Sequence, residues 1–312
     1  MAGATIISVS LTVIHQYWDF GDARYLYVLW GLWWLDSILS FICAFGLVYI
    51  MSAYHSVPIS SLTPRWLLPV MTLIVASTTG QQLANALIPI STRNSFITIS
   101  VSLLMLSVGL ILVFMILTLW IRRLLFDGGL PDAMAVPSAF LPLGPCGQSG
   151  FSLLLAGLNF NAILPTGSGA VFGDPLMGRI LNGICFSFAF TFWSLELWWL
   201  LSAIVTLLHF KIRKIQIPFN LSTWSLVFPN VRKTRFSLYL SDSIDTIVLK
   251  ILGAIQIIIV IIIWVALAIQ TLVHIIDGSI FQPADGPLPT HKELIKTSSI
   301  EQCETEGSLT RV

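Results

Sequence analysis

Charged residues are scarce in this chain of 312 residues. Asp, Glu, Lys and Arg together make up 10% of it, whereas about 25% is usual for a soluble globular domain. The hydrophobic fraction is 56% and the mean hydropathy is +0.87, so water cannot be the main solvent of the chain. We therefore expect most of its surface to contact a lipid bilayer.

The sequence lacks the usual signals of several function classes. The net charge is +1, and no large basic or acidic block interrupts the hydrophobic region, so a nucleic-acid partner is not indicated. The sequence holds no HExxH, GxSxG or Walker motif and no carboxylate pair at acid–base spacing, which argues against an enzyme. The cysteines show no CxxC or Cys/His spacing that would suggest a metal site or disulfides: Cys43, Cys146, Cys185 and Cys303. No cofactor is predicted.

Five hydrophobic runs are long enough to cross a bilayer, which takes roughly 20 mostly apolar residues as a helix. Each run is bounded by charges, prolines or polar turns. They are residues 26–51, 66–90, 96–121, 178–208 and 247–276.

Three further segments are less regular. Residues 137–160 and 218–240 carry Pro, Gly and polar residues that lipid would not tolerate, so they are expected to face a polar interior. Residues 2–15 are apolar but too short for a full crossing. The sequence thus predicts an all-α, polytopic membrane bundle of about eight spans over residues 1–276. Residues 277–312 are polar and are expected to form a disordered tail.

Basic residues in short loops indicate the orientation of the spans. The loops at 52–65, 122–136 and 209–217 contain Lys or Arg and are expected in the cytoplasm, together with the tail. Arg232, Lys233 and Arg235 break this rule, so either their segment is not a simple crossing or these cations line a watery cavity.

Two carboxylates lie within hydrophobic runs. Asp36 occurs in LYVLWGLWWLDSILSF and Glu196 in FWSLELWWLLS. An ionisable group at membrane depth needs a partner or water. Each is therefore either a proton- or substrate-linked group, or a carboxylate hydrogen-bonded at a helix end or in the interior.

The segment FLPLGPCGQSGF packs two prolines and three glycines into twelve residues. These residues should break or thin a helix and let a ligand approach the main chain. A tight helix contact through small residues is the alternative. The candidates for a substrate pathway are Gly144, Pro145, Gly147, Gln148 and Ser149, with Gly80 of the span at 66–90.

A third segment, PFNLSTWSLVFPN, places an aromatic ring beside a proline. Pro229 lacks an amide donor and should kink the span just after Phe228. A ring at a kink could close a pore, although most aromatic residues in membrane helices only pack. Trp224 and Asn230 join the pathway candidates.

These segments resemble those of the tellurite-resistance and dicarboxylate transporter family. It includes plant slow anion channels, fungal malic acid transport proteins and fungal sulfite efflux pumps. The resemblance is carried by LWGLWWLDSILSF, PRWLLPVMTLIVASTTG, FLPLGPCGQSGF and PFNLSTWSLVFPN. The residues of the LPLGPxGQ and WLLP elements are closer to those of the sulfite pumps than to those of the malate permeases.

The resemblance implies a ten-helix fold of five hairpins around a central pore, often trimeric, in a plasma membrane. It also implies that Phe228 is the phenylalanine that plugs this pore. The family's first two spans and most of its third have no counterpart here, so the domain is expected to be incomplete at its N-terminus. We therefore expect an exporter of a small anion, sulfite first and malate or another dicarboxylate second. A truncated, non-transporting subunit is the alternative of a different class.

Overall fold

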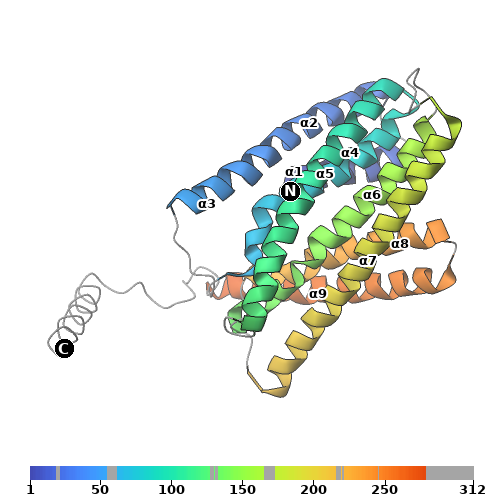
Figure 1. Cartoon of the computed structure of the whole chain (residues 1–312). Helices are drawn as coiled ribbons and strands as arrows, with labels where there is room; N and C mark the ends of the chain where they lie inside the picture. The colour runs from blue at the N-terminus through green and yellow to red at the C-terminus, as the bar shows by residue number, and fades with distance from the viewer. Residues whose placement is uncertain are drawn as a thin grey trace. The chain divides into compact units, whose positions relative to one another are not determined.

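The computed structural model describes residues 1–18, 22–54, 62–126, 130, 133–164, 173–215, 219, 221–244 and 246–278. In these residues the structure is helical and has no strand (Figure 1). Residues 1–264 form one compact unit, and a second unit begins at Val265, within the last helix. The polar tail predicted for residues 277–312 lies outside the described residues from residue 279 onward.

The described residues form eight helical segments, some of which join a 3₁₀- or π-helix to an α-helix. These are α1 with η1 (Ala2–Val9, Ser10–Tyr17), α2 with η2 and α3 (Ala23–Ile42, Cys43–Leu47, Val48–Tyr54), η4 with α4 (Pro64–Leu67, Leu68–Leu87), α5 (Thr92–Phe126), η5 followed by α6 (Ala133–Phe140, Leu143–Ile163), α7 (Pro175–Ile212), η6 with α8 (Leu221–Leu226, Val227–Ile244) and α9 (Ile247–Ile276). The all-α membrane fold predicted from the sequence is confirmed.

Five of these segments are long and apolar enough to cross a membrane. They are Ala23–Ile50, Pro64–Leu87, Thr92–Phe126, Leu176–Ile212 and Ile247–Ile276. Each overlaps one of the five runs predicted from hydropathy, and the last has the same bounds.

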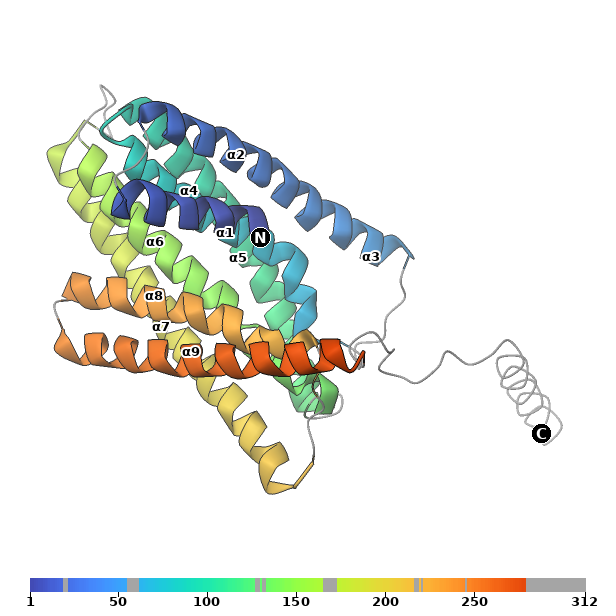
Figure 2. The ribbon, with the colours of Figure 1, turned by 180° about the vertical axis from the view of Figure 1, so that it is seen from behind.

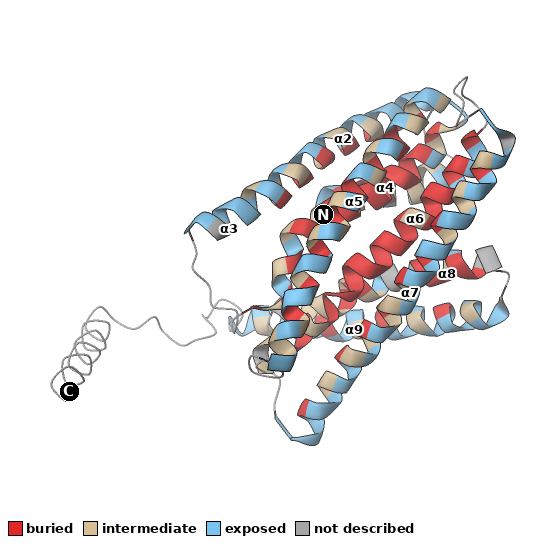
Figure 3. Cartoon of the chain, in the orientation of Figure 1, coloured by how far each residue is buried: buried red, intermediate tan, exposed pale blue. Residues whose placement is uncertain are grey.

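Burial separates inner from outer helices. The apolar window of α4 is 83% buried, whereas that of α7 is 28% buried and that of α9 is 17% buried. Figure 3 shows α4 and α6 almost wholly buried and large exposed surfaces on α2, α3 and α7. Helix α4 packs against α1, α2, α5 and α6, and α6 packs against α5, α7 and α8 as well. The outer helices expose apolar side chains, and lipid is as apolar as these side chains. A bilayer can therefore surround the bundle.

Tryptophans tie the outer helix α2 to the inner ones. The indole N–H of Trp33 donates to the carbonyl oxygen of Ala76 on α4 at 2.9 Å, and Trp33 is fully buried. The indole N–H of Trp30 donates to the Thr98 hydroxyl on α5, also at 2.9 Å. Each bond satisfies a polar group that would be costly to leave unpaired in a membrane interior.

Each proline-containing segment changes from a 3₁₀-helix to an α-helix close to its prolines. A 3₁₀-helix containing Pro137 ends at Phe140, and α6 starts at Leu143, so Pro145 lies in its first turn. The 3₁₀-helix η6 gives way to α8 at Val227, which places Pro229 in the first turn of α8. A proline is tolerated in a first turn because its missing N–H would have no helical partner there. The irregularity therefore precedes Phe228 instead of following it.

A glycine lets α8 approach α6 closely. Phe236 of α8 is fully buried, and a Cβ added at Gly150 would lie 2.5 Å from Cε1 of its ring and 3.2 Å from Cβ of Phe192. Because real Cβ contacts are never so short, only glycine fits at position 150 without moving Phe236. We call this contact the Gly150 notch.

We predict that Gly150→Ala lowers the thermal stability of the purified chain. Overpacking a well-packed contact costs about 1–3 kcal/mol, and thermal unfolding in detergent would measure it. Gly183→Ala is the matched control, because no atom lies within 4 Å of a Cβ added at Gly183. Equal unfolding temperatures for the two variants would contradict the notch.

Candidate functional site

The inner faces of α4 and α6 are joined by hydroxyl groups. Ser77 Oγ and Ser152 Oγ lie 2.9 Å apart, and the Thr78 hydroxyl donates to the carbonyl oxygen of Gln148 at 3.1 Å. All four residues are buried. A polar seam therefore runs along the contact between these two inner helices.

The seam continues into a cluster of side-chain amides near the C-terminal end of α4. Asn85 Nδ2 donates to Asn159 Oδ1 at 3.0 Å. Asn159 Nδ2 donates to the carbonyl oxygen of Gln81 at 2.9 Å and to its Oε1 at 3.2 Å. The amide of Gln81 in turn donates to the carbonyl oxygen of Ile99 at 3.4 Å. These amides satisfy one another's hydrogen-bonding groups, and their bonds join α4 to α5 and α6.

Two polar side chains at the start of α6 are buried without a hydrogen-bond partner among the described residues. Gln148 is 1% exposed and Ser149 is fully buried. Neither the nitrogen nor the oxygen of the Gln148 amide makes a hydrogen bond to a described residue, and the Ser149 hydroxyl makes none either. Leaving such a group unsatisfied costs about 1–3 kcal/mol. Buried groups of this kind are typical of places where a ligand or an ordered water supplies the missing bond.

A hollow of about 740 Å³ separates α1 from the start of α8. Both helices lie toward the viewer in Figure 2. Phe228 and Trp224 line this hollow opposite α1, and Phe228 also packs against a buried cluster around α4 and α5. We call it the α1–α8 hollow. Its lining residues are Met1, Ala2, Thr5, Ile6, Ser8, Val9, Trp224, Val227, Phe228, Val231 and Trp264.

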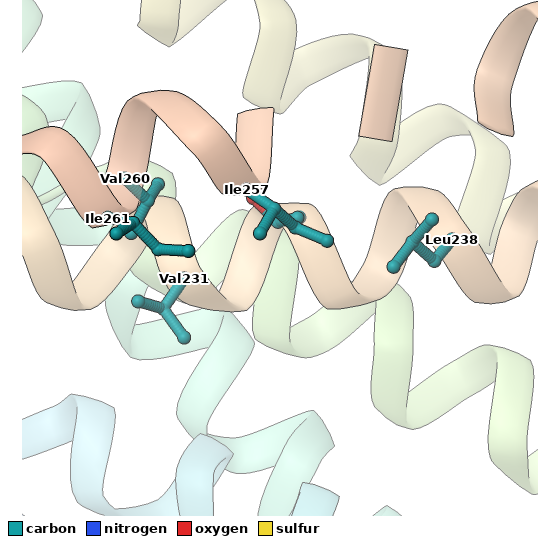
Figure 4. Close-up of a pocket in the computed structure, with 6 residues that line it drawn as sticks. Val231, Leu238, Ile257, Val260 and Ile261 are labelled. Atoms are coloured by element: carbon teal, nitrogen blue, oxygen red, sulfur yellow. The ribbon is translucent and has the colours of Figure 1, made fainter. Parts of the chain in front are cut away.

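A smaller cavity of about 280 Å³ lies between α8 and α9. Figure 4 shows Val231 and Leu238 of α8 with Ile257, Val260 and Ile261 of α9 around it. The remaining lining residue, Thr234, donates its hydroxyl to the carbonyl oxygen of Asn230 at 2.9 Å. An ion would find no replacement for its water there, so this apolar cavity is unsuited to an anion.

The two predicted carboxylates occupy different surroundings. Glu196 is fully buried in α7, and a Cβ added at Gly147 would collide with its carboxylate, so the glycine makes room for it. Asp36 is half-buried and accepts a hydrogen bond from the backbone N–H of Ala4, where it complements the start of helix α1. Among residues of described burial, Glu196 is the sole buried Asp, Glu, Lys or Arg. Proton linkage through either group stays a prediction.

The remaining predicted residues lie at helix contacts. A Cβ at Gly80 would meet Ser102 and Trp33, and a Cβ at Gly144 would meet Met71 and lie 4.0 Å from Cγ of Pro229. These two glycines thus bring helices together, which favours the packing alternative for them.

The side chain of Asn230 supplies a hydrogen bond to a main-chain carbonyl group where η6 meets α8. Its Nδ2 donates to the carbonyl oxygen of Leu226 at 2.6 Å, beside the buried Pro229. The side chains of Arg232, Lys233 and Arg235 lie outside the described part of the chain.

Sequence reasoning missed the amide cluster and the polar residues that accompany it. The signal was present as STTGQQLAN, residues 77–85, because so many hydroxyl and amide groups in a membrane span must face either one another or water.

Comparison with known proteins tests the resemblance noted in the sequence. The SLAC1 family model, described as a voltage-dependent anion channel, matches residues 1–272. A sulfite efflux pump SSU1 from Arthroderma otae is 29% identical over 265 residues, which are 85% of this chain and 67% of that protein. Its namesake from Arthroderma benhamiae is 28% identical over the same shares. Another from Candida albicans is 30% identical over 145 residues, 46% of this chain and 30% of the relative.

No solved structure matches the chain at a significant level. The names of the relatives are those of a channel and of pumps, not of enzymes. The family match covers all of the helices described above except the last residues of α9, and it agrees with the motifs that carried the resemblance. The chain therefore belongs to the SLAC1 voltage-dependent anion channel family.

Proposed function

We propose that this chain exports sulfite across the plasma membrane along the inner faces of α4 and α6 and through the α1–α8 hollow. The observation that carries the proposal is the pair Gln148 and Ser149, buried hydrogen-bonding groups without partners among the described residues. An anion leaving water needs such donors to replace its hydration shell.

The lack of buried cations among the residues of described burial supports transport over tight binding. No Lys or Arg is fully buried among the residues of described burial. A buried cation would bind an anion strongly, whereas conduction needs binding that is weak enough for release. Hydroxyl and amide donors without a fixed charge meet that need.

We propose sulfite rather than malate as the substrate because the curated relatives bear the name sulfite efflux pump. A dicarboxylate also carries its charges on separate groups and would need two sets of donors. We extend the proposal to a homotrimer, which the family resemblance implies, with the exposed apolar side chains of α5 and α7 in contact with lipid or a second copy.

Phe228 is proposed as the gate of this path. It lies in the first turn of α8, two residues after the change from 3₁₀- to α-helix, and lines the α1–α8 hollow. An aromatic ring in a conduit blocks ions by excluding water, and hydrophobic constrictions gate channels in this way.

Proteoliposomes containing the purified chain test the substrate. We expect sulfite efflux to exceed malate efflux by at least about tenfold, a barrier difference of about 1.4 kcal/mol. Malate efflux without sulfite efflux would overturn the choice of substrate. Absence of flux for both anions would favour a non-transporting subunit.

Truncation of the gate should open the path. We predict that Phe228→Ala raises sulfite flux by about tenfold, because a ring that excludes water from the conduit is removed. Phe188→Ala is the matched control, since Phe188 is 57% exposed on the outside of α7 and its removal should leave flux unchanged. Unchanged flux in Phe228→Ala would rule out the gate.

Gln148→Leu separates a functional residue from a structural one. Removing an amide that makes no bond should hold or raise the unfolding temperature, because an unsatisfied buried group is lost, while sulfite flux falls by about tenfold. Asn159→Leu is the comparison: it breaks three hydrogen bonds of the amide cluster and should lower the unfolding temperature. A lower unfolding temperature with normal flux in Gln148→Leu would assign Gln148 to the fold.

A further inference from the structure

Helix α1 supplies one wall of the α1–α8 hollow, and the start of α8 supplies the other. The α1 wall repeats at the spacing of one helix face, and so does the opposite wall with Phe228. Helix α1 packs against α2 and α4, so the width of the hollow depends on how these two helices hold α1. The residues of the α1 wall are Ala2, Thr5, Ile6 and Val9, and those of the opposite wall are Trp224, Val227, Phe228 and Val231.

The main chain of α1 is bound from two sides at Ala4. The N–H of Ala4 donates to the Asp36 carboxylate on α2. Its carbonyl oxygen accepts a bond at 3.1 Å from the Thr79 hydroxyl on α4, which also bonds within its own helix. Ala4 has no exposed surface. One turn further along α1, the Ser8 hydroxyl donates to Oε1 of Gln82 on α4 at 2.7 Å. Two successive turns of α1 are therefore fastened to the helices behind it.

A glycine admits the Asp36 carboxylate to this contact. A Cβ added at Gly3 would lie 2.6 Å from Oδ1 and 3.5 Å from Cγ of Asp36, so a side chain at position 3 would displace the carboxylate. A carboxyl group can accept the bond from Ala4 whether it is protonated or ionised. The contact thus needs an oxygen acceptor at position 36 and does not need a change of its charge.

We propose that Asp36 is a positioning residue of the anion path: by binding the Ala4 N–H, it holds the α1 wall at the distance from Phe228 that sets which ions can pass by size. The inference rests on the proposed anion transport and adds the residue that fixes the width of the path. Without this acceptor the Ala4 N–H loses its partner, which is costly in a membrane interior. The α1 wall is then free to shift and yields to a bulkier ion.

The test measures size selectivity in proteoliposomes containing the full chain. The probes are sulfite and methanesulfonate, which share a sulfur–oxygen group and differ by a methyl group. We expect Asp36→Ala to raise the ratio of methanesulfonate to sulfite flux by about threefold, the change in an equilibrium that the loss of one interhelical hydrogen bond in a membrane typically causes. Thr79→Val removes the other bond to Ala4 and should change the ratio in the same direction.

Asp36→Asn separates positioning from proton linkage. Asn keeps an acceptor oxygen but cannot exchange a proton, so the wild-type ratio is expected. A ratio as high as that of Asp36→Ala would overturn the inference, because the carboxylate itself would then be required.

Glycine variants provide a matched pair. Gly3→Ala should raise the ratio, whereas Gly31→Ala should not, because no atom lies within 4 Å of a Cβ added at Gly31 on α2. A flux ratio does not depend on how much protein folds, so partial misfolding cannot imitate the result. An unchanged ratio in Asp36→Ala, with an active wild type, would overturn this inference and leave the proposed function intact. A wild type that passes no sulfite would overturn the proposed function itself.

Discussion

Hydrogen bonding without water is the constraint on which this structure depends. A bilayer offers no partner to a polar group, so a serine, threonine or amide in a span is stabilised when it finds a partner inside the protein. Helices α4 and α6 meet this requirement for each other through Ser77 with Ser152, Thr78 with a main-chain carbonyl, and the amide cluster. The same bonds hold the two most buried helices at the centre, and the apolar helices pack around them.

Small residues make this central contact close. Gly147 leaves room for the buried carboxylate of Glu196, and Gly150 receives the ring of Phe236. Polar groups at short range and glycines at the crossing points are the usual means by which membrane helices associate, because the hydrophobic effect does not drive them together in lipid. One segment of α6 therefore combines a structural contact with the unpartnered side chains of the candidate site.

Much of the fold could be predicted from the sequence, because hydropathy reports directly on contact with lipid. The span at 247–276, for instance, has the predicted bounds. The site was less predictable. Which polar side chains pair depends on which helix faces meet, and nothing around Asn159 in the sequence indicates that it bonds Gln81 and Asn85. The position of Pro229 was also misjudged, because a proline that begins a helix and one that bends it look alike in a sequence.

The Gly150 notch has a mechanical consequence for α8. Phe236 in the notch, and Ser237, which accepts a hydrogen bond from the Trp193 indole at 3.1 Å, attach α8 about 12 Å along the helix from Phe228 at 1.5 Å per residue. The α1–α8 hollow borders the helix at Phe228, whereas Phe236 packs against α6 at the notch. A tilt of α8 by about 5° about the notch would displace Phe228 by about 1 Å.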